Sequence, residues 1–112
     1  MANKVSNINI QVEVDENHVP ESLNWTAEDG GVKDEEAKAM LLSIWDSKQQ
    51  ETLRIDLWTK DMMVNEMYIM YHQTLISMAN TLEKSTGHDK LAGALKDYCK
   101  FFAEQTKIID SK

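Results

Sequence analysis

The residues of this sequence that could do chemistry are its histidines, its cysteine and a pair of glycines. The histidines are His18, His72 and His88, and no two of them stand four residues apart. A zinc site needs three or four converging ligands, and no acid stands at helical spacing from His72 toward a common site. We therefore expect no metal site and interpret the histidines as structural or surface residues.

Neither Cys99 nor the pair Gly30 and Gly31 predicts a reaction. Cys99 lies beside the apolar positions of an expected helix, where a free thiol is usually a small hydrophobic side chain, and no histidine is placed to act as its base. A glycine loop before a helix can cradle an anion, but Asp34 and the two glutamates after it would repel one. Because the chain has 19 acids, close pairs of carboxylates are unavoidable, so such pairs give no evidence for acid–base catalysis. We expect no catalytic residue and no cofactor.

The charge of the chain excludes a nucleic-acid-binding protein of the basic-patch type. There are 12 Lys and Arg residues against 19 Asp and Glu residues, which gives a net charge of −7, and the only arginine is Arg54. Nucleic-acid affinity rests on neutralising several phosphates, which this composition does not favour. Residues 1–61 carry the whole imbalance, with 13 acids and 6 bases. This acidic half is either a solvated surface or a docking face for a basic partner.

The length and the apolar content predict a small cytoplasmic protein. The 112 residues fit a single domain, residues 1–112, with short flexible termini. One cysteine excludes an internal disulfide and favours a reducing compartment. The first residues contain no apolar run of a secretory signal, and no stretch approaches the roughly 18 apolar residues of a membrane span. We expect a cytoplasmic location and no membrane insertion.

Three stretches alternate with a period of two and predict strands. Residues 7–14 place Ile and Val on one face and Asn, Gln and Glu on the other. Residues 21–26 follow after a polar turn, with Leu23 and Trp25 on the apolar side, and should form an antiparallel hairpin with the first stretch. Residues 51–59 point Leu53, Ile55 and Leu57 inward.

Three other stretches predict helices. In residues 35–47 the apolar positions Ala37, Met40, Leu41, Ile44 and Trp45 fall at helical spacing after Asp34, which suits an N-cap. Residues 64–84 and 89–107 carry apolar stripes of their own. Gly87, which lies between these two stretches, suits a left-handed helix end.

The order of these elements, β-β-α-β-α-α, predicts an α+β fold. A helix between the second and third strands makes those two parallel, and the first strand runs opposite to both. The simplest arrangement is a three-stranded antiparallel sheet of order 2-1-3 with the first strand in the middle. Because one face of this sheet is apolar, we expect three helices packed on that face.

Several segments read together resemble a known family. They are residues 19–21 (VPE), 25–31 (WTAEDGG), 35–39 (EEAKA), 43–48 (SIWDSK), 51–62 (ETLRIDLWTKDM) and 72–75 (HQTL). The chain resembles the gliding motility protein GldC family over nearly its whole length, and the twelve-residue run is the most specific part. The family pattern has Pro where this sequence has Met63, which should loosen the start of the long helix slightly.

The resemblance implies a small accessory protein of the bacterial gliding machinery. Its members are associated with a partner lipoprotein of the same system, and the resemblance implies no enzymatic activity, cofactor or agreed binding residue. The expected function is therefore a non-catalytic role in gliding, exerted through protein–protein contact.

A stripe of Arg54, Asp56 and Trp58 is the candidate interface, because alternation puts these residues on the polar face of the third strand. A Trp beside an Arg is a common composition for an interface hot spot. The other interpretation is that the strand ends before Trp58 and the ring turns into the core. The stripe could bind a protein of the gliding apparatus or a second copy of the chain.

Methionines at the start of the long helix form a second candidate contact surface. Met62, Met63 and Met70 lie off the apolar stripe of that helix and need either a second neighbour or a partner. Methionine is common where a surface must adapt to a partner, although it also fills core gaps.

The alternative function is a small-ligand-binding or enzymatic α+β domain with a pocket between the sheet and the helices. Its lining would include the aromatic residues Trp25, Trp45, Tyr68 and Tyr71. An apolar cavity of several hundred Å³ with converging polar groups would favour this alternative.

Overall fold

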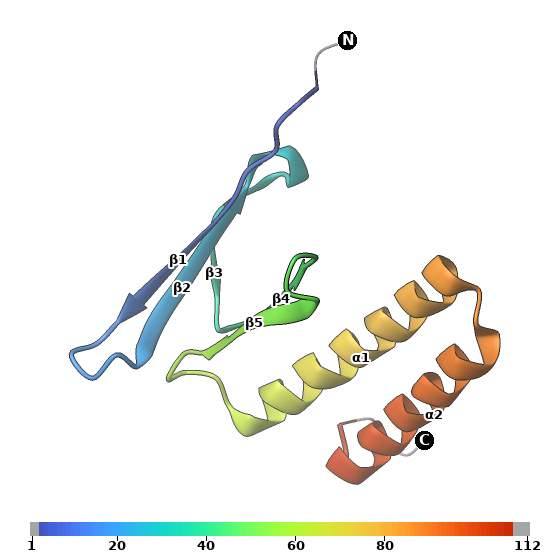
Figure 1. Ribbon diagram of the computed structural model, residues 1–112. Coiled ribbons are helices and arrows are strands. Elements are labelled where there is room, and N and C mark those ends of the chain that lie inside the picture. The colour runs from blue at the N-terminus through green and yellow to red at the C-terminus, as the bar shows by residue number, and fades with distance from the viewer. Residues whose placement is uncertain (1–2, 109–112) are drawn as a thin grey trace. The chain divides into compact units, whose positions relative to one another are not determined.

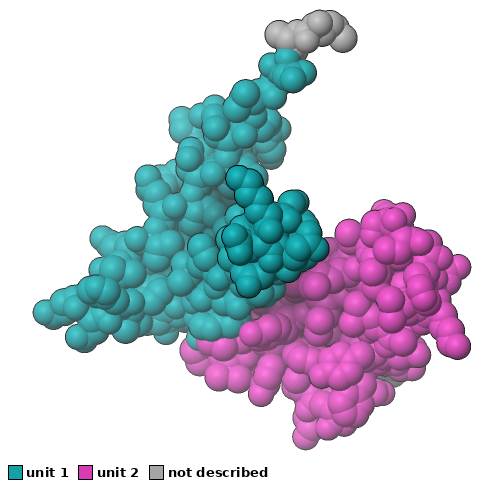
Figure 2. All heavy atoms as spheres, in the orientation of Figure 1, with its two compact units in different colours: residues 1–62 teal, residues 63–112 magenta. Residues whose placement is uncertain are grey.

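The structure is a computed structural model that describes residues 3–108, and the fold is α+β (Figure 1). The chain forms two compact units, Met1–Met62 and Met63–Lys112, coloured separately in Figure 2. The first unit contains the strands β1 (Ile8–Val14), β2 (Pro20–Ala27), β3 (Val32–Ala37), β4 (Ala39–Asp46) and β5 (Glu51–Trp58), with the short 3₁₀ turn η1 (Glu28–Gly30). The second contains the helices α1 (Val64–Thr86) and α2 (Asp89–Thr106).

The antiparallel hairpin of β1 and β2 is confirmed. Ile10 pairs with Trp25 and Val12 with the buried Leu23. The polar residues between them pair with one another on the opposite face, as in Gln11 with Asn24. The Asp15 carboxylate closes the turn by accepting hydrogen bonds from the backbone N–H groups of Asn17 and Val19. The sheet therefore has one apolar and one polar face, as the period of two predicts.

The helix expected over residues 35–47 is wrong, because this stretch completes β3 and forms β4. Asp34 is not an N-cap but a β3 residue with a positive φ of 48°. The apolar residues at helical spacing also belong to a nearly continuous apolar run, which suits a strand equally well. An eight-residue antiparallel ladder with β5 decides between them, since it pairs every residue from Ala39 to Asp46. The Asp46 carboxylate closes this second hairpin by accepting from the backbone N–H of Lys48.

The expected sheet order 2-1-3 is wrong for the same reason. Without a crossover helix, β3 follows β2 through a tight turn at Gly31, which has a left-handed φ of 74°. The three-stranded antiparallel sheet is therefore β1-β2-β3, with β2 in the middle, and β4 and β5 form a second, two-stranded sheet. The strand expected over residues 51–59 is confirmed as β5, which ends at Trp58, but its partner is β4 and not β1.

The two helices expected near the C-terminus are confirmed, and the described residues contain two long helices instead of three. Gly87 ends α1 in the left-handed conformation, with φ 68°, and its N–H donates to the Glu83 carbonyl. Small side chains are buried between the helices: Ala79, Ala92, Cys99 and Ala103. Tyr68 and Phe102 meet edge to face at a centroid distance of 6.3 Å. The helices therefore approach closely through residues with short side chains.

Two expectations about the whole chain stay predictions. One is that the chain is a single domain, and the other is that helices cover an apolar sheet face, which concerns the placement of the two units. The expected flexible termini include residues 1–2 and 109–112, which lie outside the described residues.

Residues after β5 join the two sheets of the first unit. The Lys60 backbone N–H donates to the Pro20 carbonyl at 3.2 Å. The Lys60 ammonium lies 2.6 Å from the Asp15 carboxylate and 3.1 Å from that of Glu21. This ion pair, together with the backbone hydrogen bonds of the turn, lowers the pKa of Asp15 from 3.8 to about 2.

We predict that Lys60→Met raises the pKa of Asp15 toward its ordinary value of 3.8. A lowered pKa means that the folded chain binds this proton more weakly than the unfolded chain. The stabilisation of the fold by the ionised Asp15 carboxylate is therefore complete above pH 3.8 and is lost as the pH falls through about 2. An NMR titration of the Asp15 carboxyl carbon measures the pKa directly. Lys48→Met, in the β4–β5 turn, is the control and should leave the titration unchanged.

We also predict that Ala92→Val lowers the free energy of unfolding of the helices by about 1–3 kcal/mol, because Ala92 is fully buried. Ala94→Val is the matched control, since Ala94 is exposed on the same helix and suffers the same loss of helix propensity. Urea unfolding followed by the helical circular dichroism signal measures both. Equal effects of the two variants would contradict the close packing of α1 and α2.

Candidate protein interface

The Arg54 side chain organises one face of the β4–β5 hairpin. Its guanidinium donates to the Ser43 hydroxyl at 2.6 Å and to the Asp56 carboxylate at 2.7 Å. Ser43 is the cross-strand partner of Arg54, and Asp56 is the next residue of β5 on the same face. The Arg54 and Asp56 side chains remain 45% and 41% exposed. Arg54 is thus held in one orientation while its charge stays accessible.

Two tryptophans share this face with Arg54, and we call the set Ser43, Trp45, Arg54, Asp56 and Trp58 the Arg54 face. Trp58 is the last residue of β5, lies opposite Ala39 and is half-buried. Trp45 lies opposite Thr52 and is more than half exposed. Because the sequence predicts a helix over residues 35–47, it assigns Trp45 to that helix and to the alternative pocket, and not to the predicted interface. The short polar break at residues 46–50 between two apolar runs is the hairpin signal that could have placed Trp45 on this face.

The other face of the hairpin is apolar. It consists of Met40, Leu42 and Ile44 from β4 and their partners Leu57, Ile55 and Leu53 from β5. Ile44, Leu53 and Ile55 are each more than half exposed. The helix expected over residues 35–47 cannot cover Leu53 and Ile55, because this stretch is their strand partner. We call these six residues the apolar face.

The candidate methionines belong to different units. Met62 is half-buried in the first unit, and its N–H donates to the Thr59 carbonyl at 3.1 Å. Met63 is exposed just before α1, and Met70 is half-buried about two turns further along. The Met63 N–H donates to the Glu66 carboxylate, which closes the first turn of the helix. A contact surface shared by these methionines stays a prediction.

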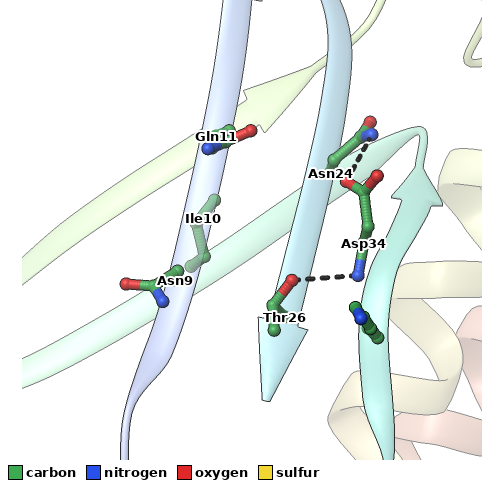
Figure 3. Close-up of a pocket in the computed structure, with 7 residues that line it drawn as sticks. Asn9, Ile10, Gln11, Asn24, Thr26 and Asp34 are labelled. Atoms are coloured by element: carbon green, nitrogen blue, oxygen red, sulfur yellow. Dashed lines mark hydrogen bonds between the residues drawn. The ribbon is translucent and has the colours of Figure 1, made fainter. Parts of the chain in front are cut away.

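A polar hollow of about 500 Å³ lies on the β1-β2-β3 sheet, lined by Asn9, Ile10, Gln11, Asn24, Thr26, Lys33 and Asp34 (Figure 3). The Asn24 amide donates to the Asp34 carboxylate at 3.0 Å. The Asp34 N–H donates to the Thr26 hydroxyl at 2.9 Å. These bonds hold Asp34 at its positive φ, and Figure 3 shows Asn9 and Gln11 on the neighbouring strand β1.

This hollow is not the pocket of the alternative function. Its lining comes from strands alone, whereas the expected pocket takes Trp25 and Trp45 from the first unit and Tyr68 and Tyr71 from the second. The ligand-binding alternative stays a prediction.

The histidines and Cys99 have structural surroundings. His88 caps α2 by accepting from the Leu91 N–H at 3.1 Å, and His72 stacks on Phe102 at a centroid distance of 6.4 Å. His18 lies in the β1–β2 turn with a φ of 65°. Burial raises the pKa of the Cys99 thiol, so the reactive thiolate is disfavoured. Within residues 3–108, no three His, Cys, Asp or Glu side chains converge as metal ligands would.

A comparison with known protein families shows which family this chain belongs to. Residues 20–108 match the family described as gliding motility-associated protein GldC-like. The chain belongs to the GldC-like family. The match runs from the start of β2 to the last described residue, so it includes the Arg54 face, the apolar face and both helices.

GldC-like membership gives the protein a gliding motility-associated role. No curated protein and no solved structure is similar enough to this chain to match it. Neither α1 nor α2, as described, has the length and apolarity needed to cross a bilayer.

We predict that the thiol of Cys99 reacts slowly in the folded protein, because Cys99 is buried between the helices. Alkylation with iodoacetamide at pH 8 should be at least about tenfold slower than in the urea-unfolded chain. Mass spectrometry of timed samples measures both rates. Equal rates would show that the α1–α2 contact opens readily.

Proposed function

We propose that this GldC-like protein is a non-catalytic accessory component of the gliding machinery that acts by binding another protein through its β4–β5 hairpin. The observation that carries the proposal is the exposure of both hairpin faces, where Ile44, Trp45, Leu53 and Ile55 are each more than half exposed. Apolar side chains gathered in one place on a protein surface mark interaction sites. A two-stranded hairpin is also marginally stable in water, so this one gains from a partner.

The Arg54 face supplies the specific contacts in this proposal. Trp and Arg are enriched among interface residues whose loss costs most binding energy. The bonds from Arg54 to Ser43 and Asp56 fix the guanidinium before a partner arrives. A side chain held in its bound orientation loses less conformational entropy on binding.

The proposal places the protein in the cytoplasm. Its support is the chemistry of the one cysteine, since a lone free thiol suits a reducing compartment. Recovery of the untagged protein from an outer-membrane or periplasmic fraction of intact cells would contradict this part of the proposal.

The test reverses the charge of the Arg54 side chain. We expect Arg54→Glu to abolish spreading of gliding cells and recovery of gliding proteins with the chain, because losing a hot-spot side chain costs about 2 kcal/mol or more of binding. Stability should change by no more than about 1 kcal/mol, since the Arg54–Asp56 pair is exposed. Lys48→Glu is the matched control, because it makes the same charge change in the adjacent turn and should leave spreading intact.

Trp58→Ala separates the two interpretations of Trp58. A stable variant with impaired spreading supports a place in the interface. A loss of several kcal/mol of stability assigns Trp58 to the core and removes it from the proposed contact. Normal spreading by both Arg54→Glu and Trp58→Ala would contradict the proposal that this face binds the partner.

A further inference from the structure

The outer edge of β1 is an unprotected sheet edge. In the order β1-β2-β3, β1 pairs only with β2 among the described strands, so its other side offers a row of backbone N–H and C=O groups. Its seven residues, INIQVEV, include no Pro, no Gly and a single charge, that of Glu13. Segments of this composition pair readily with further strands. Native proteins usually block or cover such an edge.

The opposite edge of the same sheet, β3, shows how this protein blocks an edge. β3 carries four consecutive charged residues, Lys33, Asp34, Glu35 and Glu36. It is also irregular, because the register shift against β2 places an extra residue on β3 itself and Asp34 has a positive φ. The register shift between β1 and β2 instead places its extra residue, Glu21, on β2, so β1 stays regular. Charged side chains and irregular backbone are the usual obstacles to strand addition. The contrast between the two edges points to β1 as the one that accepts a strand.

We propose that a second copy of this chain pairs with β1, antiparallel and in the register that places Gln11 opposite Gln11 of the second copy. This register is the one that uses the whole strand, because residues 8 and 14, 9 and 13, and 10 and 12 then face each other. Two sheets join into one of six strands. The surface is distinct from the β4–β5 hairpin, so this proposal goes beyond the proposed partner contact.

The side chains of β1 are complementary to themselves in this register. Ile10 faces Val12 and Ile8 faces Val14 on the apolar face of the sheet. On the polar face the Asn9 amide faces the Glu13 carboxylate, which can accept its N–H, and no acid faces an acid. The two ends of β1 gain most, since Ile8 and Val14 are 69% and 47% exposed. In the dimer, Ile8 of each copy contacts Val14 of the other copy, so both exposed ends of β1 become covered.

The experiment measures the oligomeric state of the full chain by sedimentation velocity over a range of concentrations. We expect a reversible dimer with a dissociation constant of roughly micromolar order, because a single pair of short strands buries less than a standard interface. Gln11→Lys and Gln11→Glu each place two like charges face to face at the two-fold axis. Each should weaken the dimer by roughly tenfold or more.

The register is tested by mixing the two variants. Equimolar Gln11→Lys and Gln11→Glu should form a heterodimer, since a lysine then faces a glutamate, and native mass spectrometry distinguishes it from homodimers. Gln49→Lys in the exposed β4–β5 turn is the charge-matched control and should dimerise as the unaltered chain does. Circular dichroism checks that all variants are folded.

Three outcomes overturn the proposal. They are a monomeric unaltered chain at several hundred micromolar, unchanged dimerisation of both Gln11 variants, and a variant mixture that stays monomeric. None of these results bears on the Arg54→Glu experiment, because Arg54 lies on the other sheet of the first unit.

Discussion

The Lys38 carbonyl oxygen is the point on which the strand unit depends. It accepts one hydrogen bond from the Thr59 N–H at 2.7 Å and another from the Thr59 hydroxyl at 2.9 Å, and Thr59 is buried. Lys38 is the bend between β3 and β4, and Thr59 directly follows β5. The end of the two-stranded sheet is therefore fixed to the three-stranded one, and Lys60 extends this junction to the β1–β2 hairpin. A two-stranded hairpin has little stability of its own, so this junction is what makes the Arg54 face available as a defined surface.

The side chains that the helix unit buries are small, and the strand unit buries few large ones, which explains why so much apolar surface is exposed. The helices meet through alanines and Cys99, while larger residues such as Tyr98 and Phe101 stay more than half exposed. Close approach through small side chains brings the helix backbones together but removes little apolar area from water. In the strand unit Leu23 is buried, whereas the hairpin apolar face is largely open. An apolar surface of this kind is stable in a soluble protein when another surface covers it.

Local patterns predicted β1, β2, β5 and both long helices, but they did not predict β3 and β4, which depend on pairing between distant residues. The alternation of residues 7–14 and the stripes that end at Gly87 are properties of neighbouring residues, and both predictions are confirmed. Residues 35–47 failed because an apolar run with Ala37, Met40 and Leu41 suits a helix and a buried strand equally. The ladder with β5 decides for the strand. One wrong element then changed the sheet order, because a crossover helix makes its flanking strands parallel.

The same distinction explains which part of the candidate site the sequence could predict. Arg54 and Asp56 share a face because they are two residues apart on one strand, which alternation alone establishes. Trp45 joins them only because Ser43 pairs with Arg54 across the hairpin, eleven residues away. In the expected helix, Trp45 would have been a core residue, and that helix would have packed on the apolar face of β5. As part of β4, Trp45 becomes exposed beside an arginine, and the side chains expected to be buried become a surface. The candidate interface therefore depends on the strand pairing more than on any single motif, since the ladder places Trp45 on the Arg54 face and gathers the six residues of the apolar face.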